Sequence, residues 1–133
     1  MFTTIITPSF MDMDCLGHAN NTASARWFEL VRTKTTIRLI DPELELSKET
    51  FPLILAHTDY DFVAQIYLKS DVEVKTWISR IGTKSFTVYH EAWQDGRLCV
   101  KGSAVVVYFD FIKNESIPIP DDKRKLLEEH LKT

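Results

Sequence analysis

Acidic and amide side chains crowd into the segment from Asp12 to Asn21, immediately before a predicted helix. A carbonyl oxygen placed at the start of that helix would meet free backbone N–H groups and the positive end of the helix dipole. A neighbouring carboxylate could then attack the carbonyl carbon or take a proton from water. One carboxylate and a few N–H donors suit the hydrolysis of an activated acyl group, such as a thioester, better than that of an amide. The alternative stays open that Asp12 and Asp14 only hold a turn through side-chain to backbone bonds.

Several other enzyme classes are disfavoured by the residues that the chain lacks. Ser103 lies inside a predicted strand, and no Gly-x-Ser-x-Gly turn is present for a serine hydrolase. Cys15 lies near the helix start and near His18, an arrangement that can lower a thiol pKa, but Asp12 and Asp14 oppose a thiolate. These two acids and His18 also lack the spacing of a metal site. We therefore expect no metal and no phosphate-cradling glycine loop.

A long helix is predicted directly after the acidic segment. Asn20, Asn21 or Thr22 can each cap its first turn, and apolar residues recur at helical intervals as far as Ile40. Proline at position 42 disfavours helical geometry in the residue before it, so we expect the helix to end at 41–42. Its apolar face is broad and requires a cover.

That cover is predicted to be an antiparallel sheet. Asp95 and Gly96 join two β-rich runs, which is the strongest short-range hairpin signal. The expected order is a strand, the long helix, four strands and a short terminal helix, which is an α+β domain with a curled sheet around the helix. The strands are expected at 2–10, 51–66, 71–81, 84–94 and 97–111, and the last helix is expected to end near Leu131.

Composition limits the class of protein. The 133 residues suit one domain, and 16 basic against 19 acidic residues give a net charge of −3. This charge argues against nucleic-acid binding through general electrostatics, so an anionic ligand must meet a local patch. Cys15 and Cys99 form no disulfide framework and suggest reduced thiols in the cytoplasm. We also expect neither a signal peptide nor a bilayer-spanning segment.

The acidic segment carries a family resemblance. Together with the aromatic pair at 27–28, Glu29 and Arg32, it resembles the signature of hot-dog-fold thioesterases of the 4-hydroxybenzoyl-CoA thioesterase type. The likeness covers nearly the whole chain, which would form a single hot-dog domain over residues 1–133. The matching stretches are Asp12-Met13-Asp14-Cys15-Leu16-Gly17-His18-Ala19-Asn20-Asn21, Phe62–Tyr67, Val72–Val74, Arg80–Phe86 and Asp95-Gly96.

The resemblance implies roles for individual residues. Asp14 would be the nucleophile or the general base, and backbone N–H groups around Asn20, Asn21 and Thr22 would polarise the thioester carbonyl. Gly17 would permit the tight turn, and His18 would bond the loop backbone. Ser24 stands where a Tyr is common, so the acyl pocket would be roomier or more polar. The residues implied along the coenzyme A arm are Phe62, Lys69, Arg80, Thr83, Lys84 and Ser85, although a solvated strand face explains the polar ones equally well.

The expected activity is hydrolysis of an acyl thioester of coenzyme A or of acyl carrier protein, with no cofactor beyond that substrate. A hot-dog hydratase or dehydratase is the first alternative, but the chain lacks its Asp-x-Asn-Pro-x-His arrangement. A non-catalytic module that binds acyl thioesters is the second. One helix leaves the other face of the sheet, with Trp77 and Trp93, uncovered, so we expect a homodimer or a dimer of dimers. His57 and Asp59 are expected to be structural or to line the site.

Overall fold

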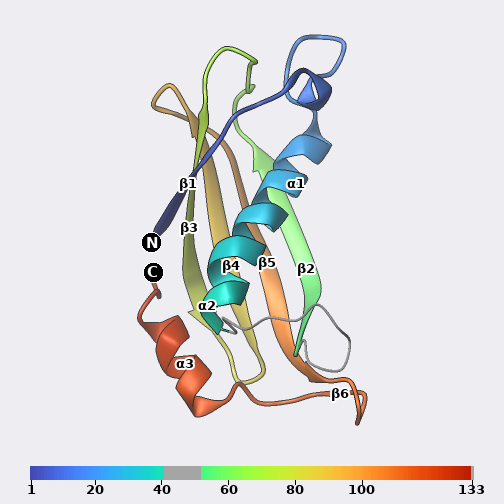
Figure 1. The fold of residues 1–133 in the computed structure, drawn as a ribbon, viewed down its shortest axis with the longest axis vertical. Coiled ribbons are helices and arrows are strands. Elements are labelled where there is room, and N and C mark those ends of the chain that lie inside the picture. The colour runs from blue at the N-terminus through green and yellow to red at the C-terminus, as the bar shows by residue number, and fades with distance from the viewer. Residues whose placement is uncertain (41–51, 133) are drawn as a thin grey trace.

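A curled antiparallel sheet wraps one long helix in the computed structural model, which describes residues 1–40 and 52–132 (Figure 1). The strands lie in the order β1-β3-β4-β5-β2, and a short β6 pairs with β5. This arrangement confirms the predicted α+β class, and the predicted element order holds except for the short β6, which the sequence did not predict. The elements are β1 (Phe2–Ile6), η1 (Phe10–Asp12), α1 (Asn21–Val31), η2 (Arg32–Ile37), α2 (Arg38–Ile40), β2 (Leu53–Phe62), β3 (Val72–Ile81), β4 (Ser85–Gln94), β5 (Arg97–Asp110), β6 (Glu115–Ser116) and α3 (Asp121–Glu128).

The long helix begins where the sequence predicts and changes its winding in the middle. Asn20 is the N-cap, because its side-chain oxygen accepts hydrogen bonds from the N–H groups of Thr22 and Ala23 at 2.9 and 3.1 Å. The segment η2 is a π-helix, and the hydroxyl of Thr35 donates to the Val31 carbonyl at 2.6 Å. Wide π turns of this kind are rare and are frequent at functional sites. The predicted stop at 41–42 lies outside the described residues.

The sheet follows the predicted meander from β3 to β5. Asp95 and Gly96 form its β4–β5 turn with φ of 52° and 75°, as a two-residue hairpin requires. Two predicted strands are too long. β1 ends at Ile6, before Pro8, which cannot donate a ladder hydrogen bond. β2 ends at Phe62, after which the N–H groups of residues 63 and 64 both donate to the carbonyl of Cys99.

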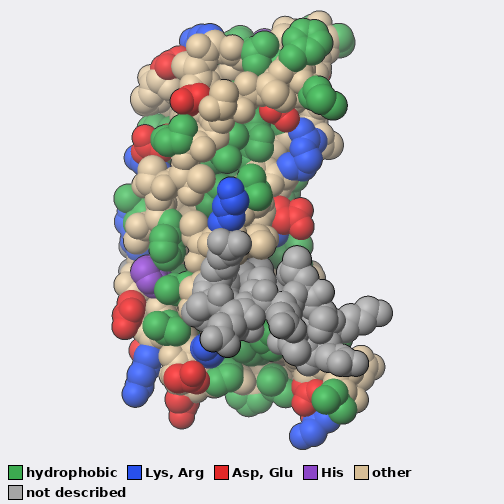
Figure 2. Space-filling model, in the orientation of Figure 1, with side chains coloured by type: hydrophobic (Ala, Val, Ile, Leu, Met, Phe, Trp, Pro, Cys, Tyr) green, Lys and Arg blue, Asp and Glu red, His purple; other side chains and the backbone are tan. Residues whose placement is uncertain are grey.

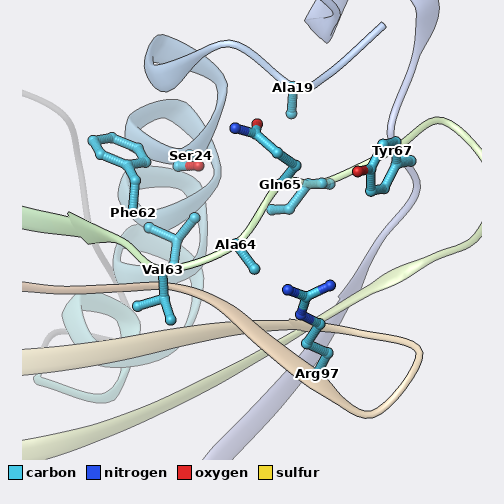
Figure 3. A pocket seen from close by; sticks show the side chains of 10 residues that line it. Ala19, Ser24, Phe62, Val63, Ala64, Gln65, Tyr67 and Arg97 are labelled. Atoms are coloured by element: carbon cyan, nitrogen blue, oxygen red, sulfur yellow. The ribbon is translucent and has the colours of Figure 1, made fainter.

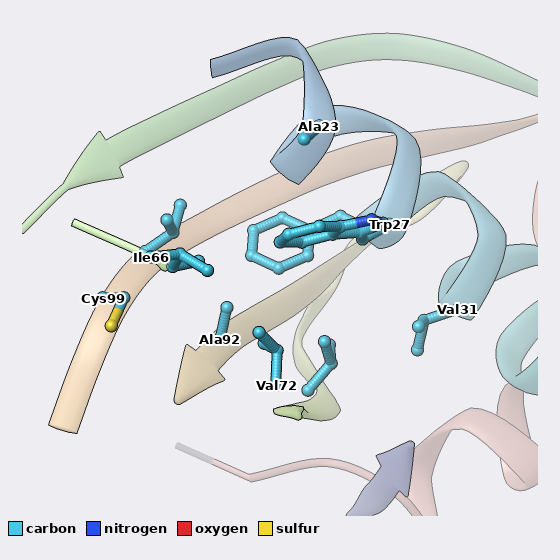
Figure 4. Close-up of a cluster of buried hydrophobic side chains, with 10 residues drawn as sticks. Ala23, Trp27, Val31, Ile66, Val72, Ala92 and Cys99 are labelled. Carbon is cyan, nitrogen blue, oxygen red and sulfur yellow. The ribbon is translucent and has the colours of Figure 1, made fainter. Parts of the chain in front are cut away.

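The core lies between the helix and the concave face of the sheet. Trp27 and Phe28 are 6% and 0% exposed and pack with apolar residues of β3, β4 and β5. Figure 4 shows Trp27 reaching down from α1 between Ala23 and Val31, over Val72 and Ala92 of the sheet. The broad apolar face of the helix therefore has the cover that the sequence required.

The convex face of the sheet carries no helix among the described residues. Trp77 and Trp93 lie there half-buried, and lysines cover part of each ring. The Nζ of Lys75 lies 4.6 Å from the Trp93 ring centroid, and that of Lys132 lies 4.2 Å from the Trp77 ring centroid. In the part of the chain that the structure describes, no helix has the length and apolarity to span a bilayer.

Candidate active site

The acidic segment folds as a small hairpin ahead of α1. The N–H of Asp14 donates to the His18 carbonyl at 2.8 Å, and Met13 pairs with Ala19. Gly17, at φ 77°, supplies the left-handed conformation that the tip of this hairpin needs. The carboxylate of Asp14 accepts the N–H groups of Leu16 and His18 through one oxygen, at 2.9 and 3.2 Å. Asp14 thus holds its own turn, as the simpler alternative proposed, while its side chain stays exposed and its second oxygen has no partner among the described residues.

Asp12 anchors the same hairpin to the helix. One carboxylate oxygen accepts the N–H of Ser9 at 2.8 Å and the Ser9 hydroxyl at 3.1 Å, and the other lies 2.7 Å from Nη2 of Arg26. Burial by itself would raise the pKa of Asp12, but the bonds from Ser9 and Arg26 outweigh it and lower that pKa below its ordinary value. Asp12 is therefore a structural carboxylate, which leaves Asp14 as the acid of the hairpin that can meet a ligand.

The helix start offers fewer free donors than the sequence suggests. The side chain of Asn20 occupies the N–H groups of Thr22 and Ala23, and the N–H of Asn20 donates to the carbonyl of Asp12 at 2.9 Å. Among the described residues the N–H of Asn21 donates to no protein acceptor. Of the three expected donors, Asn21 is thus the one whose N–H is available to a ligand without the loss of an existing bond.

A pocket of about 310 Å³ lies beside the helix start, under the loop that follows β2. Figure 3 shows the pocket between Ser24 of α1 and Arg97 at the start of β5, with loop residues 63–67 on its wall. Two of the predicted substrate residues, Ser24 and Phe62, line this pocket. The lining residues are Ala19, Ser24, Phe62, Val63, Ala64, Gln65, Ile66, Tyr67, Arg97 and Val100.

Asp14 does not line this pocket, but its hairpin is bonded to two residues of the pocket wall. The His18 and Tyr67 backbones form a β-bridge, and their rings meet edge to face with centroids 5.1 Å apart. Ala19, at the end of the hairpin, donates its N–H to the carbonyl of Ile66 at 2.8 Å. The hairpin is therefore fastened to the pocket wall, and both the backbone and the ring of His18 take part in that attachment.

The other predicted substrate residues lie far from this pocket within one protomer. Arg80, Thr83, Lys84 and Ser85 surround the β3–β4 turn, whereas the pocket lies beyond the opposite ends of β3 and β4. A ten-residue strand separates the two ends by about 30 Å. The turn is instead tied to the C-terminal segment, because the Ile119 N–H and the Arg124 guanidinium both donate to the Thr83 carbonyl.

Sequence reasoning missed two polar residues around the pocket, Arg97 at the start of β5 and Gln94 at the end of β4. Arg97 follows the hairpin turn and lines the pocket as well as a neighbouring hollow of about 250 Å³ that includes Lys69. Gln94 holds the loop by accepting the Tyr67 N–H at 2.9 Å and donating to the carbonyls of Tyr67 and Ser70 at 2.7 and 2.8 Å. The available signal for Gln94 was a glutamine at an inward-facing position of the alternating β4 pattern.

A serine, a histidine and an aspartate lie together on the convex face, but they are not arranged as the catalytic triad of a serine hydrolase. The Ser103 hydroxyl donates to Asp59 at 2.7 Å, and His57 Nε2 lies 3.4 Å from the same carboxylate oxygen. The aspartate stands between the two other groups, so no imidazole is placed to take the serine proton. Burial raises the pKa of the Cys99 thiol, which also disfavours a thiolate there.

A long helix wrapped by one curled antiparallel sheet, with an acidic hairpin at the helix start, is the hot-dog fold of thioesterases. The family model described as the thioesterase-like superfamily matches residues 8–127, and the chain belongs to that superfamily. It is accordingly placed among the thioester hydrolases.

Solved structures give the same fold. A predicted thioesterase from Bacillus stearothermophilus is 41% identical over 99% of this chain and 97% of that one, with a TM-score of 0.91. A thioesterase from Thermus thermophilus, complexed with coenzyme A and zinc, is 24% identical over 96% and 91% of the two chains, with a TM-score of 0.83. A gentisyl-coenzyme A thioesterase is 21% identical over 95% and 99%, with a TM-score of 0.79. These last two likenesses are evidence for the fold alone. No curated protein matches the chain.

Proposed function

We propose that the protein hydrolyses acyl-coenzyme A thioesters, with Asp14 as the nucleophile or as the base that activates water. The observation that carries this proposal is the exposed Asp14 carboxylate, which is held by one oxygen and keeps the other for the reaction. The N–H of Asn21 and the positive end of α1 would stabilise negative charge on the thioester oxygen. If Asp14 activates water, the water oxygen bonds to the carbonyl carbon as the C–S bond breaks, and the water proton reaches the departing sulfur to give free coenzyme A thiol. If Asp14 is the nucleophile, the C–S bond breaks as a mixed anhydride forms, and a water molecule then hydrolyses that anhydride to the free acid.

Two cations beside the pocket support coenzyme A as the carrier of the acyl group. Arg97 is exposed and has no ion pair among the described residues, and Lys69 is paired only with the exposed Asp95 at 3.3 Å. A chain of net charge −3 needs such a local patch to receive phosphates. We assign Lys69 and Arg97 the first contacts with the phosphates, and an acyl carrier protein would use its phosphopantetheine at the same place.

We further propose that two protomers complete each site. β2 lies at the edge of the sheet and offers ten residues whose outer backbone groups have no strand partner in the described chain. Large apolar side chains are exposed along this edge and on the segment from η1 to the acidic hairpin. Figure 2 shows several hydrophobic side chains exposed at the upper end of the molecule, where Figure 1 places this segment. The exposed side chains are Phe10, Met11, Leu16, Leu55, Phe62 and Val63. Association through β2 would cover them.

We also propose a cytoplasmic location, because the two cysteines are free thiols.

The test is thiol release from a panel of short, long and aromatic acyl-coenzyme A thioesters. We expect Asp14→Asn to lower kcat by at least about 100-fold, in the range that positioned acid–base groups contribute, with an unchanged melting temperature. Asp71→Asn, an exposed carboxylate outside the site, is the matched control and should keep full activity. Full activity in Asp14→Asn would refute the role of Asp14. Binding of acyl-coenzyme A without any thiol release would instead identify the non-catalytic module.

A further inference from the structure

A buried arginine lies inside the fold, two helical turns beyond the pocket. Ser24, Phe28 and Arg32 stand four residues apart along the helix and therefore share the face that packs on the sheet. All three are buried, and Arg32 is 6% exposed. At 1.5 Å per residue, Arg32 lies about 12 Å along the helix from Ser24, which lines the pocket.

Arg32 has no acidic partner among the described residues, either as an ion pair or as a hydrogen bond. Burial lowers the pKa of its guanidinium, although Tyr60 and Glu29 act in the opposite direction. Arginine nevertheless stays charged in proteins. No nitrogen of Arg32 is among the fully enclosed side-chain atoms that lack a partner, so its guanidinium is not sealed from solvent and has room to receive an anion that the described chain does not supply.

The charge of Arg32 acts on a buried imidazole, that of His90. His90 is 1% exposed, its Nδ1 lies 2.9 Å from the hydroxyl of Thr76, and its Nε2 is enclosed without a hydrogen-bond partner. Burial, together with the charge of Arg32, lowers the pKa of His90 to about 3, so the ring is neutral at physiological pH. A neutral imidazole can donate or accept at Nε2, depending on its tautomer.

Aromatic rings connect this polar pair to the pocket. Phe28 stacks on His90 on one side and on Tyr60 on the other, with centroids 4.9 and 6.0 Å apart, and Tyr60 stacks on Phe62 of the pocket wall at 6.3 Å. Phe28 fits here because Gly102 beneath it lacks a side chain. Tyr60 is only partly buried and lies on edge strand β2, so this row of rings reaches the surface at the edge of the sheet.

We propose that Arg32, with His90 beside it, binds a carboxylate at the far end of the acyl group. The preferred substrates would then be thioesters of dicarboxylic acids, a specificity that rests on the proposed thioesterase function. The thioester would lie at the helix start, the carbon chain along the row of Phe62, Tyr60 and Phe28, and the second carboxylate on the guanidinium. An extended chain of eight carbons spans about 9 Å at ~1.25 Å per bond, and a carboxylate–guanidinium hydrogen bond of about 3 Å brings the total to about 12 Å.

The test compares octanoyl-coenzyme A with its ω-carboxylated counterpart, suberyl-coenzyme A. We expect the native enzyme to favour the suberyl thioester in kcat/KM, and Arg32→Gln to lower kcat/KM for that substrate about 10- to 100-fold with less than about a threefold change for octanoyl. Arg32→Lys keeps the charge and should retain part of the preference, which guards against a variant that merely misfolds. Lys34→Gln, an exposed cation on the same helix, is the matched control and should behave as the native enzyme.

Binding of the free acids gives a readout that does not depend on turnover. Suberate should raise the melting temperature of the native enzyme and of Lys34→Gln, but not that of Arg32→Gln, and octanoate should not show this difference. Equal losses for both thioesters in Arg32→Gln, or a native preference for octanoyl, would overturn the carboxylate site. Failure to hydrolyse any thioester would refute the proposed function instead, while suberate binding would still decide the role of Arg32.

Discussion

The anchoring of the acidic hairpin by Asp12 gives a prediction whose size follows from its contacts. The substitution Asp12→Asn keeps the shape of the side chain and removes its charge. The bonds from Ser9 and Arg26 then lose their charge assistance, which accounts for roughly half of the strength of such bonds. Bonds to charged groups contribute about 1.5–3 kcal/mol, and the Arg26 pair is discounted because its side chain is 54% exposed.

The expected loss is about 1.5 kcal/mol of unfolding free energy at pH 7, or about 5 °C in melting temperature for a domain of this size. Urea unfolding followed by circular dichroism measures it. Because the folded-state pKa of Asp12 is lowered, its stabilisation is present above the ordinary pKa of about 3.9 and is lost as the pH falls through the folded value. The difference between native protein and variant should therefore shrink below about pH 4.

Asp71→Asn is the control, since Asp71 accepts one hydrogen bond from Thr7 at an exposed site, and it should cost less than about 0.5 kcal/mol. Native-like stability of Asp12→Asn at pH 7 would refute the anchoring role. A difference that is equally large at pH 7 and at pH 3 would refute its attribution to the charge.

Two further predictions concern the core. Gly102→Ala would place a Cβ 2.6 Å from the backbone oxygen of Asp59 and 3.3 Å from Phe28. The substitution should lower the unfolding free energy, measured with denaturant, by about 1–3 kcal/mol. Gly82→Ala is the control and should lower it less, because its added Cβ would have contacts of 3.2 Å or more. His90 has a folded pKa of about 3, so the unfolded chain binds its proton first and stability falls as the pH drops below about 6.5, by up to about 1.4 kcal/mol per unit. His90→Gln should flatten that slope between pH 6.5 and pH 5, and an unchanged slope would contradict the assignment.

Local patterns were sufficient to predict most of the fold. Asn20 caps the helix and Asp95-Gly96 turns the hairpin because both effects depend on a few neighbouring residues. The alternation in β3 and β4 was read correctly, since one face of each strand is buried against the helix. The end of β2 was missed, because Phe62 is followed by apolar residues that continue the same pattern in an irregular loop.

The site shows the same division between local and distant information. The sequence by itself determined the acidic hairpin with Asp14 and the helix start beside it, because these groups are neighbours in the chain and their chemistry depends on residue type. Only the tertiary structure decided that Arg97 joins Ser24 at the pocket and that the β3–β4 turn lies at the other end of the sheet. It also decided that the charge of Arg32 acts on the buried His90, 58 positions away in the sequence. Such meetings follow from strand order and helix packing, which the pattern along one chain does not specify.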